Sequence, residues 1–143
     1  MKSIKPKILF SGAMLFFMLL SVSSFAQKMN FVNSTVVPSA MGSVKIDRDK
    51  NKNYNIDISI MHLTDPSRLT PSKKSYVVWI QTEYNGVKNI GRLHSASGFL
   101  SNTMKASLHA VTPLKPSKVF VTAEDYGDAQ MPGSVIVLST KSF

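Results

Sequence analysis

The chain has 143 residues, of which 17 are Lys or Arg and 8 are Asp or Glu, and its formal net charge is +9. This length suits a single domain, and the absence of Cys excludes disulfides, thiol catalysis and thiolate metal sites. A basic chain can attract an anionic partner, but its lysines are scattered along the sequence, which is more typical of a solvated sheet surface.

Residues 1–26 have the layout of a secretory signal peptide. Three lysines lie within the first seven residues, Ile8–Leu20 is mostly apolar, and Ser24-Phe25-Ala26 places small residues where a signal peptidase cuts. The mature domain is therefore expected to be 27–143, exported to the periplasm or the outside, without a stable membrane span after cleavage and without a nucleic-acid partner. The alternative is an uncleaved anchor, although a bilayer span needs about 20 apolar residues.

The sequence after Gln27 alternates short strand patterns with turn signals. In Tyr54–Met61 the apolar residues fall at every second position, which is typical of a strand with one buried face. Asn85-Gly86 is a favoured pair for a tight hairpin turn, because both residues tolerate a positive φ. The remaining expected strands are 42–46, 76–82, 87–93, 105–111, 119–123 and 135–140, with a short one at Phe99-Leu100.

This series of strands, with no amphipathic helix among them, predicts an all-β domain. Short strands at regular spacing over about 110 residues favour an immunoglobulin-like antiparallel β-sandwich. A small β-barrel is the alternative.

No catalytic or metal-binding signature is present, so we expect neither catalytic residues nor cofactors. His62, His94 and His109 lack the spacing of metal ligands, and there is no G-x-S-x-G motif. A small envelope hydrolase that uses His94 or His62 remains an alternative. The Asp47–Asn53 run has the alternating oxygen ligands that begin a calcium loop, but Lys52 replaces the turn glycine.

One strand pattern lacks a polar face. In 76–82, Tyr76, Val78 and Ile80 point to one side while Val77 and Trp79 point to the other. Large exposed apolar areas usually mark interaction sites. The apolar outer face of this sheet, with candidate binding residues Tyr76, Val78, Ile80 and Phe120, is therefore the expected partner site. The alternatives are that these residues are simply good strand formers, or that Phe31–Val37 covers the face; Trp79 itself is expected to be a core anchor.

Several motifs between residues 75 and 140 resemble the C-terminal extracytoplasmic domain of anti-sigma-K factors. They are Tyr76-Val77-Val78-Trp79, Gly91, Val121-Thr122-Ala123-Glu124, Pro132-Gly133-Ser134 and Val135-Ile136-Val137-Leu138. The resemblance implies a β-sandwich outside the cytoplasmic membrane, with no catalytic residues. The chain departs from the family in having no sigma-binding region and no internal membrane helix, and in reading Asp125-Tyr126-Gly127-Asp128 where members often show Pro and a Gly pair.

These observations together predict a non-enzymatic, exported module that binds an envelope protein or polymer. A purely structural accessory domain is a further alternative.

Overall fold

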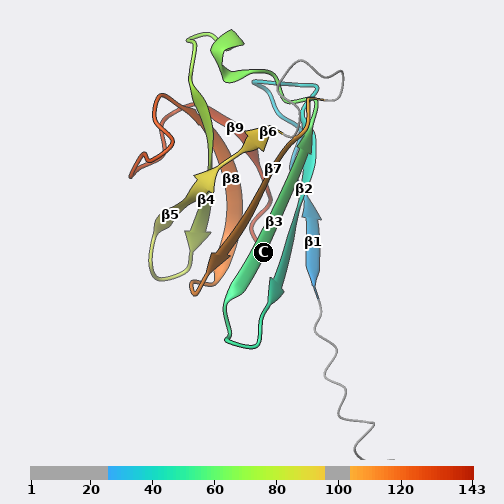
Figure 1. Ribbon diagram of the computed structural model, residues 1–143, viewed down its shortest axis with the longest axis vertical. Helices are drawn as coiled ribbons and strands as arrows, with labels where there is room; N and C mark the ends of the chain where they lie inside the picture. The colour runs from blue at the N-terminus through green and yellow to red at the C-terminus, as the bar shows by residue number, and fades with distance from the viewer. Residues whose placement is uncertain (1–25, 96–103) are drawn as a thin grey trace, which may run out of the picture.

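The computed structural model describes residues 26–95 and 104–143, so most of the predicted signal peptide and the predicted Phe99-Leu100 strand lie outside the described residues. Two antiparallel sheets face each other (Figure 1). The first, sheet A, has the strand order β1-β2-β3-β7-β6, and the second, sheet B, has the order β5-β4-β8-β9. The strands are β1 (Gln27–Asn30), β2 (Met41–Arg48), β3 (Tyr54–Met61), β4 (Ser75–Thr82), β5 (Val87–Arg92), β6 (His94–Ser95), β7 (Ala106–Thr112), β8 (Pro116–Glu124) and β9 (Ile136–Ser139).

The predicted antiparallel sandwich is confirmed, and the sheets do not close into the alternative barrel. The helical content of the described residues is one 3-10 turn, η1 (Pro66–Arg68), and no helix there is long and apolar enough to cross a membrane. The Asp65 side chain caps this turn, and hydrogen bonds from the side chain and the backbone of Ser67 lower the pKa of its carboxyl group.

The main core lies between the two sheets. In β3 the expected alternation holds, because Ile56, Ile58 and Ile60 are buried while Asp57 and Ser59 face outward. Burial of a side chain of this size stabilises the fold by about 1.5–3 kcal/mol. Phe31 and Val37 also pack into this core, so their segment closes the interior and does not cover an outer face.

The central strands of sheet B are buried on both sides. Tyr76, Val78 and Ile80 belong to the main core, whereas Val77 and Trp79 form a second cluster with Phe120. The connection between β8 and β9, residues 125–135, supplies Ala129 to this second cluster. We call this connection the strap.

Three connections meet at one end of the sandwich. The β2–β3, β4–β5 and β7–β8 turns all lie at the lower end in Figure 1, as the antiparallel pairing requires. The η1 turn lies at the opposite end. Side chains from 48–53, 82–87 and 112–116, which are distant in sequence, therefore project from the same end.

Candidate functional site

The predicted apolar partner face is not exposed. Tyr76, Val78 and Ile80 have exposed fractions of 3%, 0% and 0%, and they point into the core between the sheets. Phe120 is 8% exposed and lies on the other face of sheet B, because its register partner in β4 is Trp79. The grouping of these four residues as one open face was therefore wrong: the register separates them, and both faces are covered within the monomer.

The strap is what covers the outer face of sheet B. Asn89 of β5 holds it in place, because its side-chain Nδ2 donates to the carbonyl oxygens of Gly127 at 3.1 Å and Ala129 at 2.9 Å. The Oδ1 atom of Asn89 accepts from Gly91 N at 2.8 Å, which fixes the side chain. The strap also carries two exposed large hydrophobic residues, Tyr126 and Met131.

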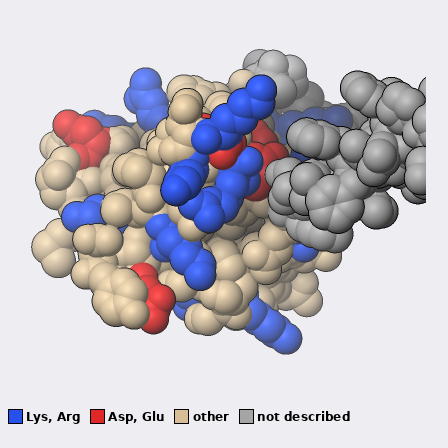
Figure 2. Space-filling model, turned by 90° about the horizontal axis from the view of Figure 1, so that it is seen from below, with Lys and Arg blue, Asp and Glu red and all other residues tan. Residues whose placement is uncertain are grey.

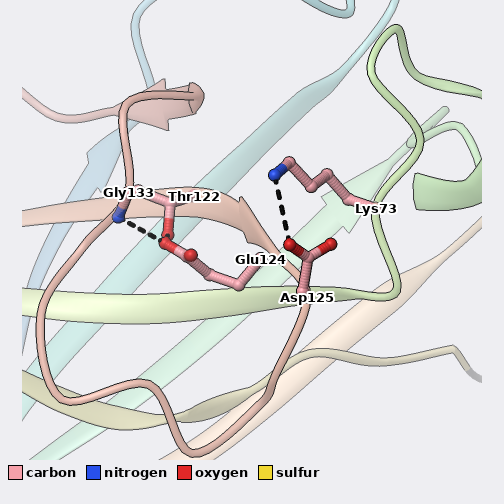
Figure 3. A network of polar contacts seen from close by, with 5 residues as sticks. All are labelled: Lys73, Thr122, Glu124, Asp125 and Gly133. Atoms are coloured by element: carbon pink, nitrogen blue, oxygen red, sulfur yellow. Dashed lines mark hydrogen bonds and ion pairs between the residues drawn. The ribbon is translucent and has the colours of Figure 1, made fainter.

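A chain of polar contacts ties the buried indole to the strap, and Figure 3 shows its part from Thr122 through Glu124 to Gly133. Trp79 Nε1 donates to Thr122 Oγ1 at 2.7 Å, and the Thr122 hydroxyl donates to Glu124 Oε1 at 2.6 Å. The same carboxylate oxygen accepts from Gly133 N at 2.6 Å, near the far end of the strap. Beside this chain, Lys73 Nζ pairs with Asp125 Oδ2 at 3.5 Å. Every bond of the chain is made within the domain, so the arrangement is suited to hold the strap.

The three histidines lie in separate places. His109 Nδ1 is 2.6 Å from Asp57 Oδ1 on the exposed face of sheet A, and His62 follows β3 with a positive φ of 57°. His94 lines a hollow of about 460 Å³ together with Arg92 and Asp128. Among the described residues that line this hollow there is no Ser, Thr or Cys, so they supply a base and a carboxylate without a nucleophile. Among the described residues, no three His or acidic side chains are grouped as metal ligands.

The carboxylates of the calcium-like run make hydrogen bonds within the β2–β3 hairpin. Asp49 Oδ1 accepts from Asn51 N at 2.8 Å and from Asn53 N at 2.9 Å. Asp47 Oδ1 accepts from Asn55 Nδ2 at 2.9 Å. This pattern is that of a side chain that shapes a turn, with Lys52 in the left-handed region at φ 64°.

The strongest surface feature is a gathering of cations at the lower end of the sandwich. Figure 2 looks at this end, where Lys and Arg side chains outnumber Asp and Glu across the middle of the surface. We call this surface the basic end, and its cations are Arg48, Lys50, Lys52, Lys88, Lys115, Lys118 and Lys141. Lys118 is half-buried, and the other six are exposed.

These cations are not neutralised by ion pairs. In the described part of the chain the ion pairs are Lys73–Asp125 and His109–Asp57, and neither involves the basic end. Arg48 lies over the ring of Tyr54, with 5.1 Å between the guanidinium carbon and the ring centroid. The acidic residues nearby are Asp47 and Asp49, which are engaged in the hairpin, and Glu83. The positive charge is therefore available to a partner.

Comparison of the chain with protein-family models, with curated proteins and with solved structures gives no match.

Proposed function

We propose that this chain is a non-enzymatic, exported β-sandwich module of the cell envelope that binds an anionic envelope component through its basic end. In this role it would be similar to the extracytoplasmic domain of anti-sigma-K factors as a stand-alone module. The observation that carries the proposal is the gathering of seven cations from four separate segments at one end, without an ion pair to any described residue.

Simple electrostatics supports this role. Exposed cations attract anions only over about 8 Å at physiological ionic strength, so scattered lysines act singly whereas gathered ones act together. Each cation of the basic end lies on or next to a hairpin or strand end, where a large partner can approach without meeting the body of the sheets. Binding of this kind should weaken as salt increases.

Two variants with the same net charge test the proposal. Lys50, Lys52 and Lys115 are changed to Glu in one variant, and Arg68, Lys74 and Lys105 in the other. All six residues are exposed, but the second set lies away from the basic end. The readout is the salt concentration that elutes each protein from immobilised inorganic polyphosphate, with circular dichroism as a check on folding.

The basic-end variant should elute at much lower salt than the wild-type protein, and the control variant should change little. Equal losses in the two variants would mean that net charge alone drives retention, which would overturn the proposal. A wild-type protein that polyphosphate does not retain at low salt would also overturn it.

Export is tested separately by the intact mass of the secreted protein, which should correspond to a chain beginning near Gln27.

A small hydrolase is the second candidate function, and the hollow that holds both His94 and Asp128 is the observation that favours it. A His–carboxylate pair can activate a water molecule when the two side chains are hydrogen-bonded, but no hydrogen bond joins them here among the described contacts. If a hydrolytic activity is found with ester or amide probes, His94→Ala should abolish it. Activity that persists in His94→Ala would remove this candidate.

A further inference from the structure

The basic end also carries exposed apolar side chains, which a purely electrostatic site does not need. Tyr84 is 87% exposed, the highest value among the large hydrophobic residues of the described part. Val87 and Phe143 are exposed at the same end, and the backbone N–H of Phe143 donates to Ser117 O at 2.9 Å, which places it beside the start of β8. Cations and aromatic side chains are therefore presented together.

The hairpin that carries Tyr84 is held firmly. Thr82 Oγ1 donates to Gly86 O at 2.7 Å and accepts from Asn85 N at 2.9 Å, and Thr82 N donates to Gly86 O at 2.9 Å. Gly86 has φ 70°, a conformation that glycine adopts without strain. The ring of Tyr84 thus projects from a short, well-bonded turn, and holding it there adds little ordering cost when a partner binds.

We propose that the anionic partner of the basic end is a phospholipid surface, with Tyr84 as an interfacial anchor. This inference rests on the function proposed above and names its ligand class. Tyr prefers the boundary between headgroups and acyl chains, because its ring is apolar and its hydroxyl is polar. Lys and Arg near an anionic leaflet are attracted to its negative surface potential.

A soluble polyanion offers the same phosphate charge but no apolar layer. It would engage the lysines and leave Tyr84 in water, whereas a bilayer would take up both. The role of Tyr84 therefore distinguishes the two sources of phosphate. Tyr126, which is 70% exposed on the strap, offers a matched control at a distance from the basic end.

The test measures co-sedimentation of the 27–143 protein with vesicles of phosphatidylcholine alone and of phosphatidylcholine mixed with phosphatidylglycerol. The wild-type protein should bind the mixed vesicles and not the neutral ones. Tyr84→Ala should weaken vesicle binding by about tenfold, as expected for a ring that leaves water on binding. Tyr84→Trp should retain binding, and Tyr126→Ala should match the wild-type protein.

The polyphosphate column separates this inference from the one on which it rests. Tyr84→Ala should elute from polyphosphate at the same salt as the wild-type protein, whereas the Lys50, Lys52 and Lys115 variant should lose both polyphosphate and vesicles. Retention on polyphosphate without vesicle binding would overturn the lipid inference and leave the proposed function standing. Vesicle binding that is unchanged in Tyr84→Ala would overturn the role of Tyr84 as an anchor. A wild-type protein that binds neither polyphosphate nor vesicles would overturn both proposals.

Discussion

Trp79 and Thr122 are joined by a 2.7 Å hydrogen bond between neighbouring strands, from the indole Nε1 to the threonine Oγ1. Thr122 is the register partner of Val77, so the indole reaches diagonally across sheet B to make it. Because the Thr122 hydroxyl in turn donates a hydrogen bond to Glu124, which accepts from Gly133 N, the bond links the core of the outer face to the strap.

Trp79→Ala should lower the free energy of unfolding by about 3–5 kcal/mol, the range for removing a large buried aromatic side chain. The indole is fully buried and stacks on Phe120, with 6.5 Å between ring centroids. Chemical denaturation measures the loss. Trp79→Phe, which keeps a ring in place, should lose less, and a loss below about 1 kcal/mol in the alanine variant would contradict the buried position.

Thr122→Val should cost about 1–3 kcal/mol although it preserves the shape of the side chain. It leaves the Trp79 N–H without an acceptor and removes one donor from Glu124, and both groups are buried. Thr122→Ser keeps the hydroxyl group and is the matched comparison in the same denaturation experiment. A serine variant less stable than the valine variant would show that packing, and not the hydrogen bond, dominates at this position.

Asn89→Ala should loosen the strap, because it removes both side-chain bonds to the Gly127 and Ala129 carbonyls. Limited proteolysis with chymotrypsin should then cut after Tyr126, which is already exposed, faster than in the wild-type protein. Asn55→Ala removes a comparable amide bond in sheet A and should not change this cleavage. Equal cleavage of the two variants would argue against Asn89 as the residue that holds the strap.

Tyr76 should make stability depend on pH in the alkaline range. Burial, followed by the nearby Asp65 carboxylate, raises the pKa of Tyr76 above its ordinary value, and its hydroxyl donates to Thr64 O at 2.7 Å. The folded state therefore favours the neutral phenol. This contribution is complete below pH about 10, the pKa of an unfolded tyrosine, and is lost as the pH rises through the folded pKa.

The measurement is the free energy of unfolding against pH for the wild-type protein and for Tyr76→Phe. The phenylalanine variant should be less stable at neutral pH by about 1 kcal/mol, the usual value of one hydrogen bond. Above pH about 10 the free energy of unfolding should also fall less steeply with pH in this variant than in the wild-type protein. Parallel curves for the two proteins would assign the alkaline decline to other groups.

Calcium should leave the stability unchanged. Asp49 Oδ1 already accepts two backbone N–H groups, and the hairpin also carries three cations. An ion that bound only the folded state would add about 2.7 kcal/mol at a hundred times its dissociation constant. Asp49→Ala should lower the melting temperature equally with and without calcium, and a calcium-dependent rise in the wild-type protein would show that the ion binds.

The alternation of apolar and polar residues was enough to predict the strands that have one buried face and one exposed face. The alternation in β3 is confirmed, because it depends on neighbouring residues alone. The hairpin at Asn85-Gly86 is also confirmed, but its loop is wider than the tight turn expected: Gln81 pairs with Val87, and of the two turn residues Gly86 alone has a positive φ. Strand β1 was not predicted, since Gln27–Asn30 is an edge strand with a single half-buried apolar residue, Met29. Strand β8 begins at Pro116, before the predicted start, because Lys118 and Pro116 pair with Gln81 and Thr82 at the end of the sheet.

The candidate site depended on contacts that sequence pattern does not reveal. The two apolar faces of β4 were recognised, but the cover over Trp79 comes from a strap rich in Gly, Pro and polar residues, in which only Ala129 packs on the cluster. The lysines are scattered along the sequence, and they gather at one end of the domain only because of the order in which the strands are connected. Three antiparallel connections bring Lys50, Lys88 and Lys115 to the same end.

The cover over Trp79 has an optical consequence. Trp79 is the only tryptophan of the chain, and its ring is shielded from water by the strap and by Phe120. Tryptophan emission from the folded protein therefore comes from one apolar environment and should be blue-shifted relative to the unfolded chain. Because this indole lies on the outer face of sheet B and takes no part in the basic end, displacement of the strap would move the emission to the red, whereas docking through the hairpins would leave it in place.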